Sequence, residues 1–245
     1  MSCAIVVTSG KGGTGKTSLT GGVSSCLAAL GNRVLCIDMD IGLRNLDISL
    51  GMTDRALMDF TDVLEGRCSL QRAAARHPVI ENLSLLTAPL SLSPGVTEAR
   101  MAYFLREAKE QYDYILMDSP AGLGEGFRLA VCGADRAIVV SNTDASALRD
   151  AQRVVSQLSR ELPCIHLVVN KVKPKLLKRL HTTIDDAMDA AGLPLLGVVP
   201  EDEQVILAAN AGTPLILASR KGAAVAYLNI ARRLLGQRIP LMNLR

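Results

Sequence analysis

The chain alternates between short apolar runs and longer stretches of helical periodicity. The apolar runs, beginning with CAIVVT at residues 3–8, are rich in Val, Ile and Leu and end at turn residues. Short runs without polar–apolar alternation are typical of strands that are buried on both faces. We expect strands of this kind at residues 3–8, 33–38, 82–88, 112–118, 136–142, 165–171 and 194–200.

Helical periodicity fills several of the segments between these runs. Residues 17–30 follow a Gly-rich turn and end at Gly31, while in 97–111 and 146–161 the apolar residues fall on one face of a helix. Strands that alternate with helices form right-handed crossovers, which set parallel strands side by side. The sequence therefore predicts one α/β domain, with a mostly parallel, twisted sheet of about seven or eight strands and helices on both faces.

The end of the last helix sets the expected boundary of this domain. Glycine is common directly after a helix, and Gly236 is in that position here, so we place the domain at residues 1–236 and a short tail at 237–245. The tail contains Pro240 and few apolar residues, so no amphipathic membrane-targeting helix is evident in it.

Composition narrows the class of protein. The 245 residues are 49% apolar, which is enough for a substantial core, and the net charge of +3 gives no reason to expect a nucleic-acid partner. The six cysteines are dispersed without a C-x-x-C pair, and neither a signal peptide nor a membrane-spanning run is recognised. We expect reduced cysteines and a cytoplasmic protein.

Polar residues close several of the predicted strands. In open α/β sheets the ligand binds at the carboxyl ends of the strands. These residues are therefore expected to lie close together along that edge of the sheet, which we call the rim. They are Ser9, Asp38, Asp118, Asn142 and Asn170.

The first strand runs into TSGKGGTGKTS at residues 8–18, which fits the phosphate-loop spacing G-x-x-x-x-G-K-[ST]. Glycines let successive backbone N–H groups point at phosphates, and the following helix adds the partial positive charge of its N-terminus. In such a loop Lys16 reaches the β- and γ-phosphates and the Thr17 hydroxyl binds Mg²⁺. This motif in this context predicts a P-loop NTPase fold. The expected nucleotide-binding residues here are Gly10, Lys11, Gly12, Gly13, Thr14, Gly15, Lys16, Thr17 and Ser18.

Two turns that contain aspartates follow the phosphate loop in the sequence. Asp38 and Asp118 each end a strand, and we expect them to hold Mg²⁺ with Thr17, partly through water. Asp40 is the best candidate to orient the attacking water, although Asp38 and Asp40 could share these roles. After Asp118, the turn with Pro120 and Gly122 is suited to sensing a γ-phosphate.

The motif KGGTGKT, with a lysine at its second position in the loop, resembles the deviant Walker A motif of the MinD/ParA family of ATPases. The phrases IDMDIGLRNLD, DSPAG, LRDAQRV and GVVPEDEQV resemble the MinD branch of that family, in order, from residue 3 to about residue 242. The resemblance implies an ATPase that forms a homodimer with Mg-ATP and regulates where the division septum forms.

The resemblance also implies roles for individual residues. Lys11 would cross to the nucleotide of the partner subunit, so that the catalytic residues are Lys11, Lys16 and Asp40. The adenine would be bound by Asn170, Pro200, Glu201 and Asp202, and Lys171 would also bind the nucleotide. The switch residues would be Asp38, Asp40, Asn45, Asp118, Pro120 and Gly122. A MinC-like inhibitor and a MinE-like or other activator would bind Ser146, Arg149 and Asp150 at the start of a helix.

Parts of the sequence also fit other functions. The stretch NKVKPKLLKRLH has five basic residues between 171 and 179, as a ParA-type partitioner acting on DNA would use, although a solvated loop and helix start is the simpler interpretation. A flagellar-number regulator is a near relative of both. An iron–sulfur reductase of the same superfamily would need a second cysteine beside Cys132, and residues 89–100 contain none. Location is expected in the cytoplasm, with peripheral contact at the inner face of the cell membrane left open because no targeting helix is evident.

Overall fold

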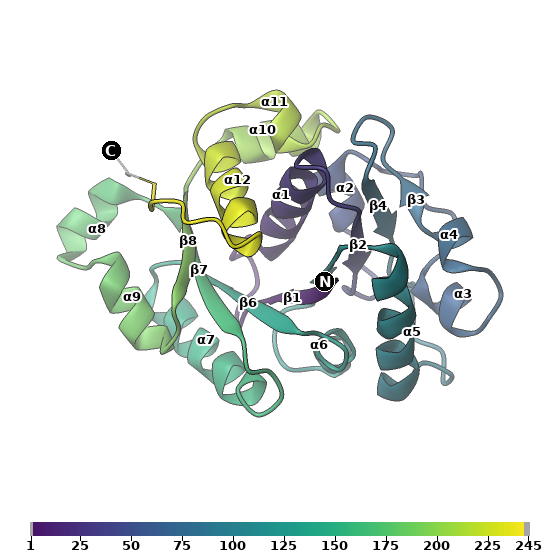
Figure 1. The fold of residues 1–245 in the computed structure, drawn as a ribbon. Coiled ribbons are helices and arrows are strands. Elements are labelled where there is room, and N and C mark those ends of the chain that lie inside the picture. Colours follow the sequence, from purple (N-terminus) through teal and green to yellow (C-terminus); the bar gives the residue numbers. More distant parts are fainter. Residues whose placement is uncertain (1, 243–245) are drawn as a thin grey trace.

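The strands form one sheet with the crossovers that the sequence predicts. A computed structural model describes residues 2–242, and over this range the sheet has eight strands in the order β3-β4-β2-β5-β1-β6-β7-β8 (Figure 1). Their bounds are β1 Cys3–Thr8, β2 Val34–Asp38, β3 Ala75–Arg76, β4 Leu83–Leu86, β5 Tyr114–Asp118, β6 Arg136–Ser141, β7 Ile165–Val172 and β8 Leu195–Pro200. The predicted α/β class and the seven predicted strands are confirmed.

The strand that the sequence did not predict is β3. It is two residues long and antiparallel to β4, whereas the other neighbouring strands are parallel. Its sequence, AR, has no apolar run, because a strand at the edge of a sheet need not be buried on both faces. The pairing depends on the packing of the preceding chain and has no local signal.

Helices cover both faces of the sheet (Figure 1). One layer contains α1 Lys16–Ala29, α2 Leu46–Leu50, α10 Gln204–Asn210, α11 Leu215–Ala218 and α12 Ala223–Leu234. The other contains α3 Phe60–Leu64, α4 Leu70–Ala73, α5 Glu98–Gln111, α6 Glu125–Val131, α7 Ala145–Leu158 and α9 Ile184–Ala191. A short helix, α8 Pro174–Leu180, lies beside the end of the sheet formed by β7 and β8. Of the expected tail at 237–245, residues 243–245 lie outside the described residues.

Each face of the sheet has its own apolar core. Along β1, Ala4 and Val6 point into the layer of α5, α6 and α7, while Ile5 and Val7 point into the layer of α1 and α12. All four side chains are buried, which explains why the strand sequences are continuously apolar. Among residues 2–242, no helix combines the length and the apolar character that a membrane crossing requires.

The layer next to the phosphate loop is held together by a close contact between α1 and α12. A Cβ atom built on Gly22 would lie 2.2 Å from Cδ2 of Tyr227. Tyr227 is fully buried, and its ring therefore packs directly on the backbone of α1. Glycine lowers the intrinsic helix propensity of α1 by about 1 kcal/mol relative to alanine. Position 22 is nevertheless glycine because a larger residue would overlap the Tyr227 ring.

We expect Gly22→Ala to destabilise the fold, although alanine is the better helix former. The new methyl group would overlap the Tyr227 ring, and overpacking of this kind typically costs about 1–3 kcal/mol in free energy of unfolding. Urea unfolding followed by circular dichroism measures the effect. Gly124→Ala is the matched control, because Gly124 has φ −73° and a Cβ there would meet no atom within 4 Å. Equal midpoints for the two variants would contradict the packing argument.

Candidate functional site

The phosphate loop connects β1 to α1 and leaves the N-terminus of that helix free. Gly13 and Gly15 have φ angles of 78° and 89°, in the left-handed region that favours glycine. Gly15 is the N-cap of α1, which has no side-chain cap and no acidic residue in its first turn. The N–H groups of the first turn are therefore directed at the loop, where they can bind an anion.

Two residues of β7 hold the loop in this shape. The Asn170 side chain, which is buried, donates from Nδ2 to the Thr14 carbonyl oxygen at 2.8 Å, and Lys171 donates from Nζ to the Gly13 carbonyl oxygen at 2.8 Å. The sequence predicts both residues at the nucleotide, and the structure brings both to the loop. Their hydrogen bonds to its backbone were not predicted, because they join positions 156 and 158 residues apart.

Gly10 allows the phosphate loop to contact the backbone of α7 directly. A Cβ atom on Gly10 would lie 2.2 Å from both C and O of the Asp150 backbone. The first glycine of the motif therefore permits contact between two backbones, in addition to the turn that the motif requires. Asp150 is one of the residues predicted to bind a partner, so this contact connects the predicted partner helix to the phosphate loop.

The two strand-end carboxylates lie side by side at the rim. Asp38 and Asp118 occupy paired positions of the neighbouring strands β2 and β5. Asp118 accepts a hydrogen bond from the Thr20 hydroxyl at 3.2 Å. Asp38 accepts from the backbone N–H groups of Asp40 at 2.9 Å and Leu46 at 3.0 Å. Asp38 thereby fixes the loop that follows β2, from Asp40 to the start of α2.

Burial governs the charge of this cluster. Desolvation raises the pKa of Asp118 to about 7, with hydrogen bonds from Thr17 and Thr20 and the charge of Lys16 acting in the opposite direction. Desolvation also raises the pKa of Asp38 and lowers the pKa of Lys16, and the carboxylates of Asp118 and Asp40 partly restore the charge of that lysine. Fixed charges buried this deeply favour a ligand that brings its own compensating charges.

A divalent cation fits the donors present at this rim. Over residues 2–242, the His, Cys, Asp and Glu side chains form no group of three or more that could hold a metal ion alone. Asp38, Asp118 and the Thr17 hydroxyl are oxygen donors of the kind that Mg²⁺ prefers, and Mg²⁺ in such sites commonly completes its shell with water and phosphate oxygens. A cation here would also offset the burial and the repulsion from Asp38 that raise the pKa of Asp118.

The two lysines of the motif point in different directions. Lys16 is 9% exposed and lies beside the carboxylates, whereas Lys11 is exposed on the outside of the loop. Lys11 donates from Nζ to the Ser146 hydroxyl, at 3.1 Å, in the first turn of α7. Ser146 and Arg149 are exposed, while Asp150 is half-buried and pairs with Arg153 at 3.6 Å. The predicted partner residues therefore lie next to Lys11.

A cavity of about 160 Å³ opens beside Gly15 and Ser18. The structure brings to it the four predicted adenine-binding positions and Lys171, which is predicted to bind the nucleotide. Its lining comprises Gly15, Ser18, Asn170, Lys171, Val199, Pro200, Glu201, Asp202, Val205, Ile206 and Tyr227. Val199, Val205, Ile206 and Tyr227 were not predicted; the helical stretch that follows the sequence PEDE is the signal that could have indicated Val205 and Ile206.

Asp202 has a structural role as well as a place in this cavity. Its carboxylate accepts from the backbone N–H of Ala223 at 2.9 Å and from that of Gln204 at 3.0 Å. The bond to Ala223 satisfies an N–H group at the beginning of α12. The predicted adenine loop is thus tied to the helix that covers α1.

The remaining predicted switch residues lie along the same rim. Gly122 has φ 87°, and its N–H donates to the Ser9 carbonyl oxygen at 3.3 Å, directly before the phosphate loop. Pro120 is half-buried against Gly126 of α6. Asn45 is the N-cap of α2. Asp40 is half-buried between Asp38 and this segment.

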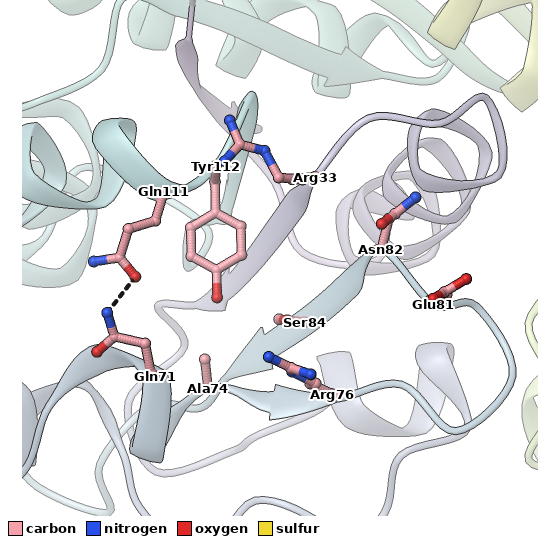
Figure 2. A pocket seen from close by; sticks show the side chains of 9 residues that line it. All are labelled: Arg33, Gln71, Ala74, Arg76, Glu81, Asn82, Ser84, Gln111 and Tyr112. Atoms are coloured by element: carbon pink, nitrogen blue, oxygen red, sulfur yellow. Dashed lines mark hydrogen bonds between the residues drawn. The ribbon is translucent and has the colours of Figure 1, made fainter.

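A second hollow, of about 320 Å³, lies at the β3–β4 side of the sheet (Figure 2). Figure 2 shows Gln71 and Gln111 hydrogen bonded to each other across it. Arg33, which also lines it, is bound by Asp113 in a bidentate pair. None of the predicted site residues lines this hollow, so the predicted nucleotide site is separate from it.

Comparison with known proteins agrees with this geometry. Residues 5–215 match the family model described as the CobQ/CobB/MinD/ParA nucleotide binding domain. The septum site-determining protein MinD of Bacillus subtilis is 41% identical over 98% of this chain and 92% of its own length. In the MinC:MinD cell division protein complex of Aquifex aeolicus, a chain with 39% identity superimposes with a TM-score of 0.91 over 99% of both chains. A septum site-determining MinD from Pyrococcus horikoshii, in complex with Mg-ADP, is 29% identical over 96% of both chains, with a TM-score of 0.83.

The parallel sheet, the glycine loop at a free helix N-terminus and the carboxylates beside it define a P-loop nucleotide-binding protein. The chain belongs to the CobQ/CobB/MinD/ParA family. Within that family it is an ATPase of the MinD/ParA kind, and the relatives cited above are MinD proteins.

We expect Asp118→Asn to remove a pH-dependent loss of stability from the nucleotide-free protein. The pKa of Asp118 is about 7 in the folded chain, against a usual value of 3.8. Between these pH values the folded chain keeps a proton that the unfolded chain has released, so Asp118 lowers the free energy of unfolding as the pH rises from about 4 to about 7. The urea midpoint of the variant, relative to wild type in EDTA, should therefore be higher at about pH 8 than at about pH 4.5. A difference that does not change with pH would contradict the raised pKa.

Proposed function

We propose that the protein is a Mg-ATP-dependent switch for division-site selection, which dimerises on binding ATP and dissociates after hydrolysis. The observation that carries this proposal is that the two lysines of the phosphate loop differ in burial and point in different directions. Lys16 is buried beside the carboxylates, while Lys11 is exposed and points away from its own loop toward α7. A cation in that position is available to a second copy of the chain.

The residues at the carboxyl ends of the strands determine the chemistry within one subunit. The N–H groups of the loop and of the first turn of α1 bind the phosphates, and Lys16 neutralises charge on the β- and γ-phosphates. Thr17, Asp38 and Asp118 would hold Mg²⁺, which would supply positive charge against the phosphates during phosphoryl transfer. Asn170 and Lys171 keep the loop in shape while the nucleotide binds.

Asp40 is the proposed residue for orienting the attacking water. Its backbone N–H is fixed by the Asp38 carboxylate at 2.9 Å, and its own side chain is half-buried at the edge of the site. Asp38 is occupied by two backbone N–H groups, which leaves Asp40 as the freer carboxylate of the pair. A carboxylate that accepts a hydrogen bond from water can direct the lone pairs of that water at the γ-phosphate.

Lys11 would complete the site of the partner subunit. A lysine that enters a second site supplies the positive charge that an arginine finger supplies elsewhere, and it makes hydrolysis depend on dimerisation. To do so it must exchange the Ser146 hydroxyl for phosphate oxygens. Charge-assisted hydrogen bonds are roughly twice as strong as neutral ones, and with phosphate both partners are charged, so the exchange is favourable.

The start of α7 is the proposed partner face. A MinC-like inhibitor, and a MinE-like or other activator, would bind around Ser146, Arg149 and Asp150. Two observations support this: the Aquifex aeolicus relative is a complex of MinC with MinD, and α7 contacts the phosphate loop through Gly10. We place the protein in the cytoplasm and, peripherally, at the inner face of the cell membrane.

The two lysines should fail in different ways. Lys16→Ala is expected to abolish nucleotide binding, because the buried cation that meets the phosphates is lost. Lys11→Ala is expected to bind ATP nearly as tightly as wild type but to remain monomeric. Fluorescent-nucleotide titration measures binding, and size-exclusion chromatography with light scattering, in Mg-ATP and Mg-ADP, measures assembly. An ATP-dependent dimer of Lys11→Ala would refute the crossing lysine.

Asp40→Ala should separate dimerisation from hydrolysis. Without the carboxylate that orients water, turnover should fall by about a hundredfold or more. The dimer formed in Mg-ATP should then persist, since hydrolysis is what dissolves it. Phosphate release and light scattering over the same time course test this expectation, with Lys11→Ala as the monomeric control. Wild-type turnover in the variant would remove Asp40 from the mechanism.

A further inference from the structure

The hollow at the β3–β4 side of the sheet lies at the opposite end of the strands from the nucleotide. Arg33, Asn82 and Tyr112, which line it, come just before β2, β4 and β5, whereas the rim is formed where β2 and β5 end. Its volume of about 320 Å³ is within the range of small-molecule sites. The ATP site therefore does not account for the polar side chains that line this hollow.

Ser84 is the buried polar group of the hollow. It is 8% exposed, and the residues on either side of it in β4, Leu83 and Leu85, belong to the core on the other face of the sheet. In the part of the chain that the structure describes, the Ser84 hydroxyl lines the hollow and has no hydrogen-bond partner (Figure 2). Buried polar groups in folded proteins normally have partners, so an open hydroxyl that faces a hollow points to a ligand.

Arg76 places a positive charge next to this hydroxyl. Arg76 of β3 and Ser84 of β4 are directly opposite in the antiparallel pair. Residues in such positions extend to the same face of the sheet, with Cβ atoms about 5 Å apart. Among residues 2–242, no carboxylate lies within 4 Å of the Arg76 guanidinium, whereas Arg33 is already bound by Asp113. An acceptor bound at Ser84 is thus within reach of an unpaired cation.

Tyr112 adds a second hydroxyl to the same space. Figure 2 shows its ring extending from the end of α5, with the hydroxyl directed into the hollow on the side of Ser84. The hydrogen bond between Gln71 and Gln111, at 2.8 Å, joins α4 to α5 beside the ring. A guanidinium and two hydroxyls can all donate, and a carboxylate can accept from all three, with bidentate geometry at the arginine. The donors of the hollow therefore fit a carboxylate.

Glu81 gives the hollow an acidic end. Glu81 is exposed, and no cation lies within 4 Å of its carboxylate in the described chain, so it does not pair with Arg76 although both residues line the hollow. A second anionic group on the ligand would be repelled there, while an ammonium or hydroxyl group would donate to it. The charges of the lining thus fit a ligand that carries one carboxylate and one donor group.

We propose that the Ser84 hollow, defined as Arg76, Glu81, Ser84, Tyr112 and the space that they border, binds a small carboxylic acid with an amino or hydroxyl group. The carboxylate accepts hydrogen bonds from Arg76, Ser84 and Tyr112, and the amino or hydroxyl group donates to Glu81. Free amino acids and small hydroxy acids have this chemistry. The site is complete in one subunit and shares no residue with the rim, so the inference does not rest on the proposed function.

Titration followed by ¹⁵N–¹H NMR tests the site and the ligand class together. L-Alanine, L-glutamine and L-lactate are the probes, and at least one of them should produce saturable shifts of the Arg76 and Ser84 amide signals at millimolar concentrations. Succinate and inorganic phosphate should bind about tenfold more weakly, because both carry a second negative charge that Glu81 repels. No saturable shift with any of the three probes would overturn the proposal. Equal or tighter binding of succinate or phosphate would refute the ligand class.

Single substitutions test the proposed contacts. Ser84→Ala should weaken binding of the best probe about fivefold, since it removes one hydrogen bond. Arg76→Gln should weaken it about tenfold or more, because the charge-assisted bonds are lost. Arg72→Gln is the matched control, since Arg72 is an exposed arginine of α4 that does not line the hollow. Wild-type affinity in both Ser84→Ala and Arg76→Gln, or equal losses in the Arg72 and Arg76 variants, would contradict the proposal.

Glu81→Gln tests the acidic end of the hollow. It should weaken L-alanine and strengthen succinate, because the same carboxylate attracts the ammonium group and repels the second anion; a change in the same direction for both ligands would refute the role of Glu81. Urea midpoints and the Mg-ATP-dependent dimer are measured for every variant, and neither should change in Ser84→Ala. A wild-type chain that binds these acids but never dimerises would refute the switch and leave the Ser84 hollow intact.

Discussion

Burial of ionisable groups at the carboxyl ends of β2 and β5 is the constraint on which the rest of the site depends. Lys16, Asp38 and Asp118 are enclosed by the sheet, α1 and the loop after β2, and burial acts against the charge of each one. A cluster of this kind is stable only when its hydrogen bonds are satisfied. Those bonds are donated by the backbone N–H groups of Asp40 and Leu46 and by the Thr20 hydroxyl. The hydrogen bonds that the buried carboxylates require therefore fix the conformation of the surrounding loops.

The phosphate loop is rigid for a related reason. Its carbonyl oxygens at Gly13 and Thr14 are held by side chains from β7, and its beginning touches the backbone of α7. The donors that a phosphate would meet are thus oriented before any ligand arrives. Preorganised donors need little rearrangement on binding, which is how positioning alone contributes to catalysis of phosphoryl transfer.

The features that could be predicted from the sequence are those with a local signal. The spacing of Gly10, Gly15 and Lys16 indicates the phosphate loop, and continuous apolar runs indicate strands that have helices on both faces. Features that depend on distant contacts could not be predicted. The strand β3 exists only through its pairing with β4, and the bond from Lys11 to Ser146 joins residues 135 positions apart. The hollow around Ser84 likewise depends on the β3–β4 pairing and on the contact of α4 with α5.

The contact between Gly10 and Asp150 has a mechanical consequence. Where two helices or loops meet through side chains, rotation about χ angles can absorb small displacements. Here one backbone rests on another, and the Asp150 carbonyl occupies the place that a Cβ atom of residue 10 would take. Such a contact contains no side-chain torsion that could absorb a displacement of α7. The start of α7 and the first residue of the phosphate loop are therefore coupled through backbone atoms alone.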